Sequence, residues 1–168
     1  LPEARRVHTA ALFDYRKQLH HDANYRAGLH ALRRLQPGGV LLDVGCAGGR
    51  FVQLAGALGY QAIGVDIDEA PVRWGREELD LDLRRAAPDS LPDNLPPVDI
   101  VSLWNVLEHV ADPPALLRAI RAAMAPEGLL LVDVPNFAFR LAAARFTGVY
   151  EPAQQRFFPY DHLNHFTA

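Results

Sequence analysis

The 168-residue chain is 49% hydrophobic and 22% charged, and its 17 basic and 20 acidic side chains leave a net charge of −3. These values predict one globular domain with one sizeable core, exclude disordered and fibrous classes, and favour a small-molecule partner over non-specific nucleic-acid binding. The one cysteine, Cys46, excludes an internal disulfide and a cysteine-clustered zinc site, and no apolar run approaches the roughly 20 residues of a membrane span, so we expect a cytoplasmic protein.

The first 36 residues form a basic segment that we interpret as an N-terminal helical cap. They carry seven basic and three acidic side chains, a local net charge of +4 against −7 for the rest of the chain. From Asp22 onward, apolar residues at three- and four-residue steps predict an amphipathic helix that ends before residues 37–39, and its arginines should face solvent. These apolar residues are Tyr25, Leu29, Leu32 and Leu35.

Short apolar runs then alternate with helical patterns. The expected strands are residues 40–44, 62–65, 79–83, 98–104 and 128–134. The expected helices contain residues 51–58, closed by Gly59, residues 69–79, and residues 113–124 with Asp112 as N-cap, and a proline-rich loop covers residues 88–97. Strands that alternate with helices predict an α/β fold with a doubly wound, Rossmann-like parallel sheet.

The loop after the first strand, residues 43–50, is rich in glycine, and ligands bind at the carboxyl ends of the strands in such sheets. It lacks the G-x-G-x-x-G pattern of dinucleotide sites, because Ala47 and Arg50 stand at the third and sixth positions. Asp43 would repel a diphosphate and attract an ammonium group. We therefore expect a ligand with a cation here, and the alternative is a strand-to-helix turn with packing glycines only.

Asp66 ends the second expected strand. A carboxylate at this position can accept two hydrogen bonds from the vicinal hydroxyls of a ribose, and Ile67 can then lie against an adenine ring. The alternative, a solvated loop acid or a helix cap, suits Asp68 better than Asp66.

Four blocks in this order carry a family resemblance: L-L-D-V-G-C-A-G-G-R-F, G-V-D-I-D, V-D-I-V-S-L-W-N-V-L-E-H-V and L-R-A-I-R-A-A-M-A-P-E-G-L-L-L-V-D-V-P-N. The sequence resembles the class I S-adenosylmethionine-dependent methyltransferases, and within them the small-molecule group that includes the ubiquinone-biosynthesis type. The resemblance covers residues 38–136, and a weaker match at D-H-L-N-H-F-T extends it to the end. It implies a strand order of 3-2-1-4-5.

The resemblance also implies S-adenosylmethionine as cofactor and S-adenosylhomocysteine as product, with a set of binding residues for each part of the cofactor. The family usually has glycine where Ala47 stands, and alanine suits the position only with a negative φ. Ala87 stands where relatives often place an acid against the adenine amino group, and Asp89 or Ser90 are the candidate substitutes. The implied contacts are Asp43, Gly45, Cys46, Ala47 and Gly49 with the methionine part, Asp66 and Ile67 with ribose and adenine, and Trp104 and Asn105 with the methionyl amino group.

The candidate base is His109, which with Glu108 follows the fourth expected strand at the mouth of the site. Its ordinary pKa of roughly 6.5 suits proton removal from an acceptor, and the alternative is that it only orders the loop. His162 and His165 could join an acceptor pocket or a divalent-metal site. Some relatives carry an acid where this chain has Asn105, so we expect no metal.

Our leading hypothesis is an enzyme that transfers a methyl group from S-adenosylmethionine to a small-molecule acceptor, with oxygen favoured. The alternatives are a nicotinamide-dependent oxidoreductase and a cofactor-binding module without turnover. We expect one methyltransferase domain with a cofactor core at 38–136 and an aromatic-rich lid or acceptor-side segment at 137–168. Relatives add a sixth and a seventh strand after such a segment, so we expect the chain to be part of a longer protein, with the sheet edge at its fourth and fifth strands exposed or covered by a partner.

Overall fold

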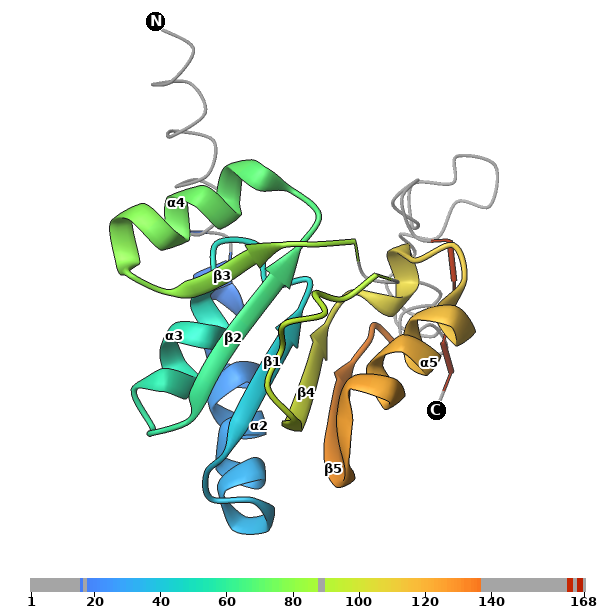
Figure 1. Ribbon diagram of the computed structural model, residues 1–168, viewed down its shortest axis with the longest axis horizontal. Coiled ribbons are helices and arrows are strands. Elements are labelled where there is room, and N and C mark those ends of the chain that lie inside the picture. The colour runs from blue at the N-terminus through green and yellow to red at the C-terminus, as the bar shows by residue number, and fades with distance from the viewer. Residues whose placement is uncertain (1–15, 17, 88–89, 137–162, 165, 168) are drawn as a thin grey trace, which may run out of the picture.

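A parallel five-stranded sheet forms the centre of the computed structural model, which describes residues 16, 18–87, 90–136, 163–164 and 166–167. The strand order is β3-β2-β1-β4-β5, which confirms the predicted fold class and order (Figure 1). The strands are β1 (Val40–Val44), β2 (Gln61–Asp66), β3 (Asp82–Arg85), β4 (Val98–Trp104) and β5 (Met124–Asp133). The helices are η1 (Leu19–His21), α2 (Asp22–Leu35), α3 (Arg50–Gly56), α4 (Glu69–Leu79), η2 (Leu107–His109) and α5 (Pro113–Ala123).

Helices cover both faces of the sheet because the central strands bury side chains on both sides. On one face, Leu41 and Ile100 pack with α2 and α3, whereas their chain neighbours Leu42 and Val101 pack with α5 on the other face. Figure 1 shows α5 on the opposite side of the sheet from α2 and α3. A smaller cluster joins α3, α4 and β3 through Val52, Val72 and Leu83. The core therefore lies in two layers that hold the carboxyl ends of β1, β2 and β4 next to one another.

Two strands lie at positions along the chain that differ from those predicted. The strand expected at 79–83 is β3 at Asp82–Arg85, because Leu79 still belongs to α4 and Asp80 closes that helix with a φ of +53°. The Leu81 N–H then bonds back to the Gly75 carbonyl at 3.4 Å. The strand expected at 128–134 begins earlier, at Met124, with a register shift opposite β4 between Val98 and Ile100.

The N-terminal helix agrees with its predicted stripe at three of the four positions. Tyr25, Leu29 and Leu32 are buried, whereas Leu35 is 71% exposed because it lies at the last turn, beyond the edge of the core. The arginines of α2 are exposed, as predicted. None of the helices in the described part of the chain has the length and apolar character needed to cross a membrane.

Several predictions concern parts of the chain outside the described residues. Most of the lid or acceptor-side segment expected at 137–168, including His162 and His165, lies there, as does Asp89. The described residues contain five strands in one sheet, and the expectation about further strands stays a prediction.

Candidate active site at the carboxyl edge of the sheet

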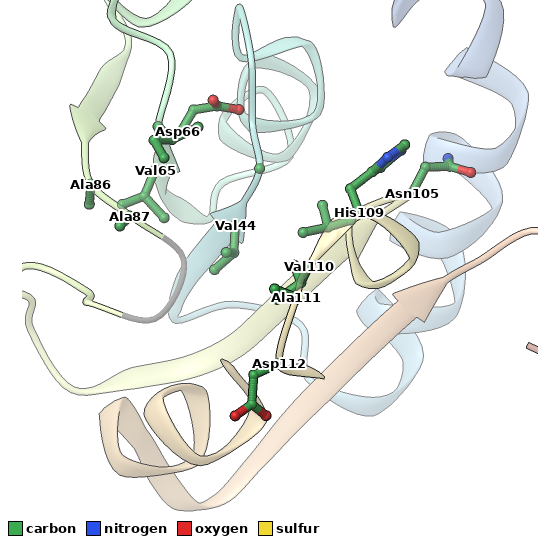
Figure 2. A pocket seen from close by; sticks show the side chains of 13 residues that line it. Val44, Val65, Asp66, Ala86, Ala87, Asn105, His109, Val110, Ala111 and Asp112 are labelled. Carbon is green, nitrogen blue, oxygen red and sulfur yellow. The ribbon is translucent and has the colours of Figure 1, made fainter. Parts of the chain in front are cut away.

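A cavity of about 500 Å³ lies where the carboxyl ends of the strands meet (Figure 2). Its walls come from the end of β1, the end of β2, the residues after β3 and the residues after β4. This volume is typical of pockets that enclose a small organic ligand. Among the residues proposed from the sequence, Gly45, Asp66, Ile67, Asn105 and His109 line it, as does Ala87. Asp43, Cys46, Ala47, Gly49 and Trp104 do not line it.

The glycine loop between β1 and α3 is held close against β2. Gly45 and Cys46 both donate their N–H groups to the Val65 carbonyl, at 2.8 and 3.1 Å. Gly45 and Gly49 have φ angles of +80° and +82°, which side chains rarely adopt. A β-carbon on Gly49 would also lie 2.8 Å from a methyl of Leu81. These two glycines are therefore required by the path of the loop.

Ala47 lies in the same loop with a φ of +45°. We expected alanine to suit this position only with a negative φ. Because the φ is positive, Ala47 carries backbone strain that glycine would avoid. Its N–H donates to Asp66 Oδ2 at 2.8 Å. The left-handed conformation is thus fixed by a contact to the neighbouring strand.

Asp66 is oriented by two backbone donors before any ligand binds. Oδ2 accepts from Ala47, and Oδ1 accepts from the Asp68 N–H at 2.9 Å. Each carboxylate oxygen keeps a further lone pair, which matches the two adjacent hydroxyls of a ribose. Asp68 accepts from the Ala70 N–H at 3.0 Å and is the N-cap of α4, as the sequence indicated. Ile67 is 60% exposed beside the cavity, where it is free to cover a flat ring.

Asp43 is buried in the sheet, one residue before Val44 of the cavity wall. It lies opposite Ser102 in the β1–β4 pairing and accepts a 2.7 Å hydrogen bond from the Ser102 hydroxyl. The pKa of Asp43 is raised to about 7, mainly by burial and to a lesser extent by the charge of Asp66, against the lowering effect of the hydrogen bond from Ser102. A cationic group placed near Asp43 would counteract both effects that raise this pKa and stabilise the carboxylate.

Cys46 and Trp104 have packing roles on the side of the sheet that bears α2, α3 and α4. The Cys46 side chain belongs to the cluster of Val52, Val72 and Leu83, and burial raises the pKa of its thiol. The Trp104 indole packs against Tyr25 and Phe51, with ring centroids 4.9 and 5.0 Å apart, and its Nε1 is buried with no hydrogen-bond partner. The side chains of both residues are therefore engaged in packing.

Asn105 follows β4 with a φ of +53°, a conformation that asparagine adopts more readily than most residues. Its N–H donates to the Asp133 carbonyl at 2.8 Å, which aligns the ends of β4 and β5. Figure 2 shows the side chains of Asn105 and His109 on the same wall of the cavity.

His109 belongs to η2, which the C-terminal residues hold in place. Leu163 and Asn164 donate their N–H groups to the Glu108 carbonyl at 2.6 and 3.1 Å. The Asn164 amide donates to the carbonyls of Leu107 and Val110 at 3.1 and 2.7 Å. The carboxylate oxygens of Glu108 are buried, and no residue in the described part of the chain hydrogen-bonds to them. No group of three or more His, Cys, Asp or Glu side chains that could hold a metal ion occurs within the described ranges.

Comparisons with known proteins show the family of this chain. A family model described as a methyltransferase domain matches residues 15–168. The chain belongs to this family. A ubiquinone biosynthesis O-methyltransferase of Caulobacter sp. (strain K31) is 32% identical over 136 residues, which cover 77% of this chain and 51% of that protein. The chain thus spans about half the length of the curated relatives that it matches.

Solved structures of similar fold extend the comparison. A S-adenosylmethionine-dependent methyltransferase from Mesorhizobium loti has 26% identity and a TM-score of 0.55 over 63% of this chain and 52% of that chain. A S-adenosylmethionine-dependent methyltransferase from Thermotoga maritima, described as a possible histamine N-methyltransferase, has 20% identity and a TM-score of 0.66 over 98% of this chain and 75% of that chain. The second likeness concerns the fold alone.

Three structural contacts of this methyltransferase domain were not predicted from the sequence. Ser102 bonds to Asp43, Arg50 pairs with Asp22, and Gln18 reaches the glycine loop. The partners are 59, 28 and 28 residues apart in the chain. No local spacing signals such pairs, because they depend on how distant segments pack.

Proposed function

We propose that this chain binds S-adenosylmethionine and transfers its methyl group to the oxygen of a small-molecule acceptor. The observation that carries the proposal is the oriented Asp66 carboxylate at a cavity of about 500 Å³ at the carboxyl edge of the sheet. Membership in the methyltransferase domain family supports the reaction type. The similarity to ubiquinone biosynthesis O-methyltransferases supports oxygen as the acceptor atom.

The residues present fit the cofactor by their chemistry. In the proposal, Asp66 binds the ribose hydroxyls and Ile67 covers the adenine ring. Gly45, Ala47 and Gly49 bring the backbone of the loop close to the methionine part, and Cys46 holds the loop in place through its backbone hydrogen bonds to Val65 and Gly49. Asp43 supplies negative charge for the methionyl ammonium group. Trp104, which ends β4, and Asn105, which follows it, would supply further contacts to that group. The cofactor supplies an activated methyl group on a sulfonium.

His109 is the proposed general base. The chain must hold the acceptor in line with the methyl group and remove the proton of a hydroxyl acceptor as the bond forms. His109 lines the cavity on the side opposite Asp66, on the element that follows β4. We also propose a cytoplasmic location, which the buried free thiol of Cys46 supports.

The decisive experiment measures S-adenosylhomocysteine formation with methyl-labelled S-adenosylmethionine and a panel of hydroxylated aromatic acceptors and their amine analogues. We expect label in a hydroxylated acceptor. Label only in the amine analogues would overturn the oxygen assignment, and cofactor binding without product from any acceptor would favour a binding module.

His109→Gln separates the proposed base from a loop-ordering residue. As a base, His109 contributes about 10²- to 10⁴-fold to kcat, and its loss should leave the affinity for S-adenosylhomocysteine and the melting temperature unchanged. A residue that only orders η2 would instead lower the melting temperature along with the activity.

A further inference from the structure

One peptide group at the centre of the glycine loop is held from both ends. The Cys46 carbonyl accepts hydrogen bonds from the Gly49 N–H at 2.9 Å and from Gln18 Nε2 at 3.0 Å. The Ala47 N–H, at the other end of the same peptide group, donates to Asp66 Oδ2 at 2.8 Å. Gln18 from the N-terminal segment and Asp66, which is assigned to the ribose, therefore hold the same peptide group in place.

This peptide group has a physical reason to turn away from its observed orientation. The φ of +45° at Ala47 places the β-carbon of an L-residue in an unfavourable region. Rotating the 46–47 peptide would relieve that strain while breaking the bonds at both of its ends. Strained backbone persists only where its surroundings over-determine it, and here the Gly49 N–H, Gln18 and Asp66 together hold the peptide.

Gln18 is itself anchored at the start of α3. Its Oε1 accepts from the Arg50 N–H at 3.4 Å, so the side chain spans the loop from Cys46 to Arg50. The Arg50 guanidinium binds Asp22 through two contacts of 2.9 and 2.6 Å, with only 16% of the Arg50 side chain exposed. This pairing lowers the pKa of Asp22 and fastens the beginning of α2 to the beginning of α3.

We propose that Gln18 is a positioning residue for the cofactor, which acts by keeping the 46–47 peptide in the orientation that orders Asp66. The inference rests on the proposed function, since it takes Asp66 as the ribose-binding residue. When the peptide turns, Asp66 loses the donor on Oδ2 and the backbone of the loop changes the groups that it presents to the methionine part. Gln18 thereby links the N-terminal helical segment to cofactor affinity without contacting the cofactor.

The test is a double-mutant cycle of Gln18→Ala and Ala47→Gly, with S-adenosylhomocysteine affinity measured by calorimetry. Gln18→Ala should weaken binding about fivefold, the value of one ordinary hydrogen bond. In the Ala47→Gly background the same change should weaken binding less than about twofold, because glycine has no strain to relieve. Gln61→Ala, at the exposed opposite end of β2, is the matched control and should leave the affinity unchanged.

Gln18→Glu provides a second variant that keeps the side-chain size and lacks the Nε2 donor. It should weaken binding at least as much as Gln18→Ala, because it brings a carboxylate to the Cys46 carbonyl. An equal loss from Gln18→Ala in both backgrounds would overturn the proposal, as would no loss from either Gln18 variant. If the parent chain does not bind S-adenosylhomocysteine, the proposed function fails, but the same cycle followed by urea unfolding still tests the peptide contact: coupled losses support it and additive losses contradict it.

Discussion

Replacing Asp43 by Asn should stabilise the cofactor-free protein and impair the proposed site. Asp43 is buried, with a pKa of about 7 in the folded protein compared with its usual 3.8. An acid whose pKa is raised by folding destabilises the native state increasingly as the pH rises from the unfolded value to the folded value. The amide of Asn keeps an acceptor for the Ser102 hydroxyl without a buried charge.

The size of this destabilisation follows from the folded and unfolded pKa values of Asp43. The raised pKa of Asp43 costs the folded protein about 4 kcal/mol at pH 8, where the carboxylate is ionised in both states, and about 2 kcal/mol at pH 5, where folding must protonate it. The effect of Asp43→Asn on the free energy of unfolding should therefore become more favourable by about 2 to 3 kcal/mol between pH 5 and pH 8. This difference between two pH values cancels any packing change that the amide introduces, because such a change does not titrate.

Urea unfolding of the two proteins at both pH values measures this quantity. Asp93→Asn, in an exposed loop, is the matched control and should show no such dependence on pH. In parallel, calorimetry should show that Asp43→Asn weakens S-adenosylhomocysteine binding about tenfold or more, the cost of losing a charge-assisted contact. An effect on unfolding that is equal at pH 5 and pH 8 would refute the burial argument for Asp43.

Three further predictions follow from the described contacts. The affinity for S-adenosylhomocysteine should rise as the pH increases from 6 to 8, because the ligand's ammonium group favours ionised Asp43 and binding then releases a proton. Calorimetry in buffers of different ionisation enthalpy measures the proton release. An affinity that does not change with pH would contradict this prediction. Ala47→Gly should raise the melting temperature, with a gain of about 1 kcal/mol from relief of the left-handed strain, and a lower melting temperature would exclude that strain. Gly75→Ala should lower the free energy of unfolding by about 1 to 3 kcal/mol, because the new β-carbon would lie 2.7 Å from the Gly48 carbonyl oxygen. Gly56→Ala is the control, since a β-carbon there would have no neighbouring atom within 4 Å. A Gly75→Ala protein that is more stable than the parent would refute the close approach.

The strands of the sheet could be predicted where several local signals agreed. The buried apolar runs of β1 and β4 and the capped α4 have the bounds that their sequences indicated. The position of β3 could not be predicted, because alternating leucines and acids suit a strand at 79–83 as well as at its true place. The left-handed conformation of Asp80 ends α4 at Leu79, so the strand can begin only after Asp80.

The candidate site was partly predictable for the same physical reason. Gly45 and Asp66 directly follow or end strands, so the topology alone brings them to one edge of the sheet. The contact of Gln18 with Cys46 joins segments 28 residues apart, and the strain at Ala47 is a property of the folded loop. Neither leaves a periodic or compositional trace in the chain.

Calorimetric titration with S-adenosylhomocysteine tests the central claim most directly. We predict one binding site per chain, a large loss of affinity in Asp66→Ala, and no comparable binding of NADH. A folded parent chain that does not bind S-adenosylhomocysteine, or one whose binding is unaffected by Asp66→Ala, would contradict the account.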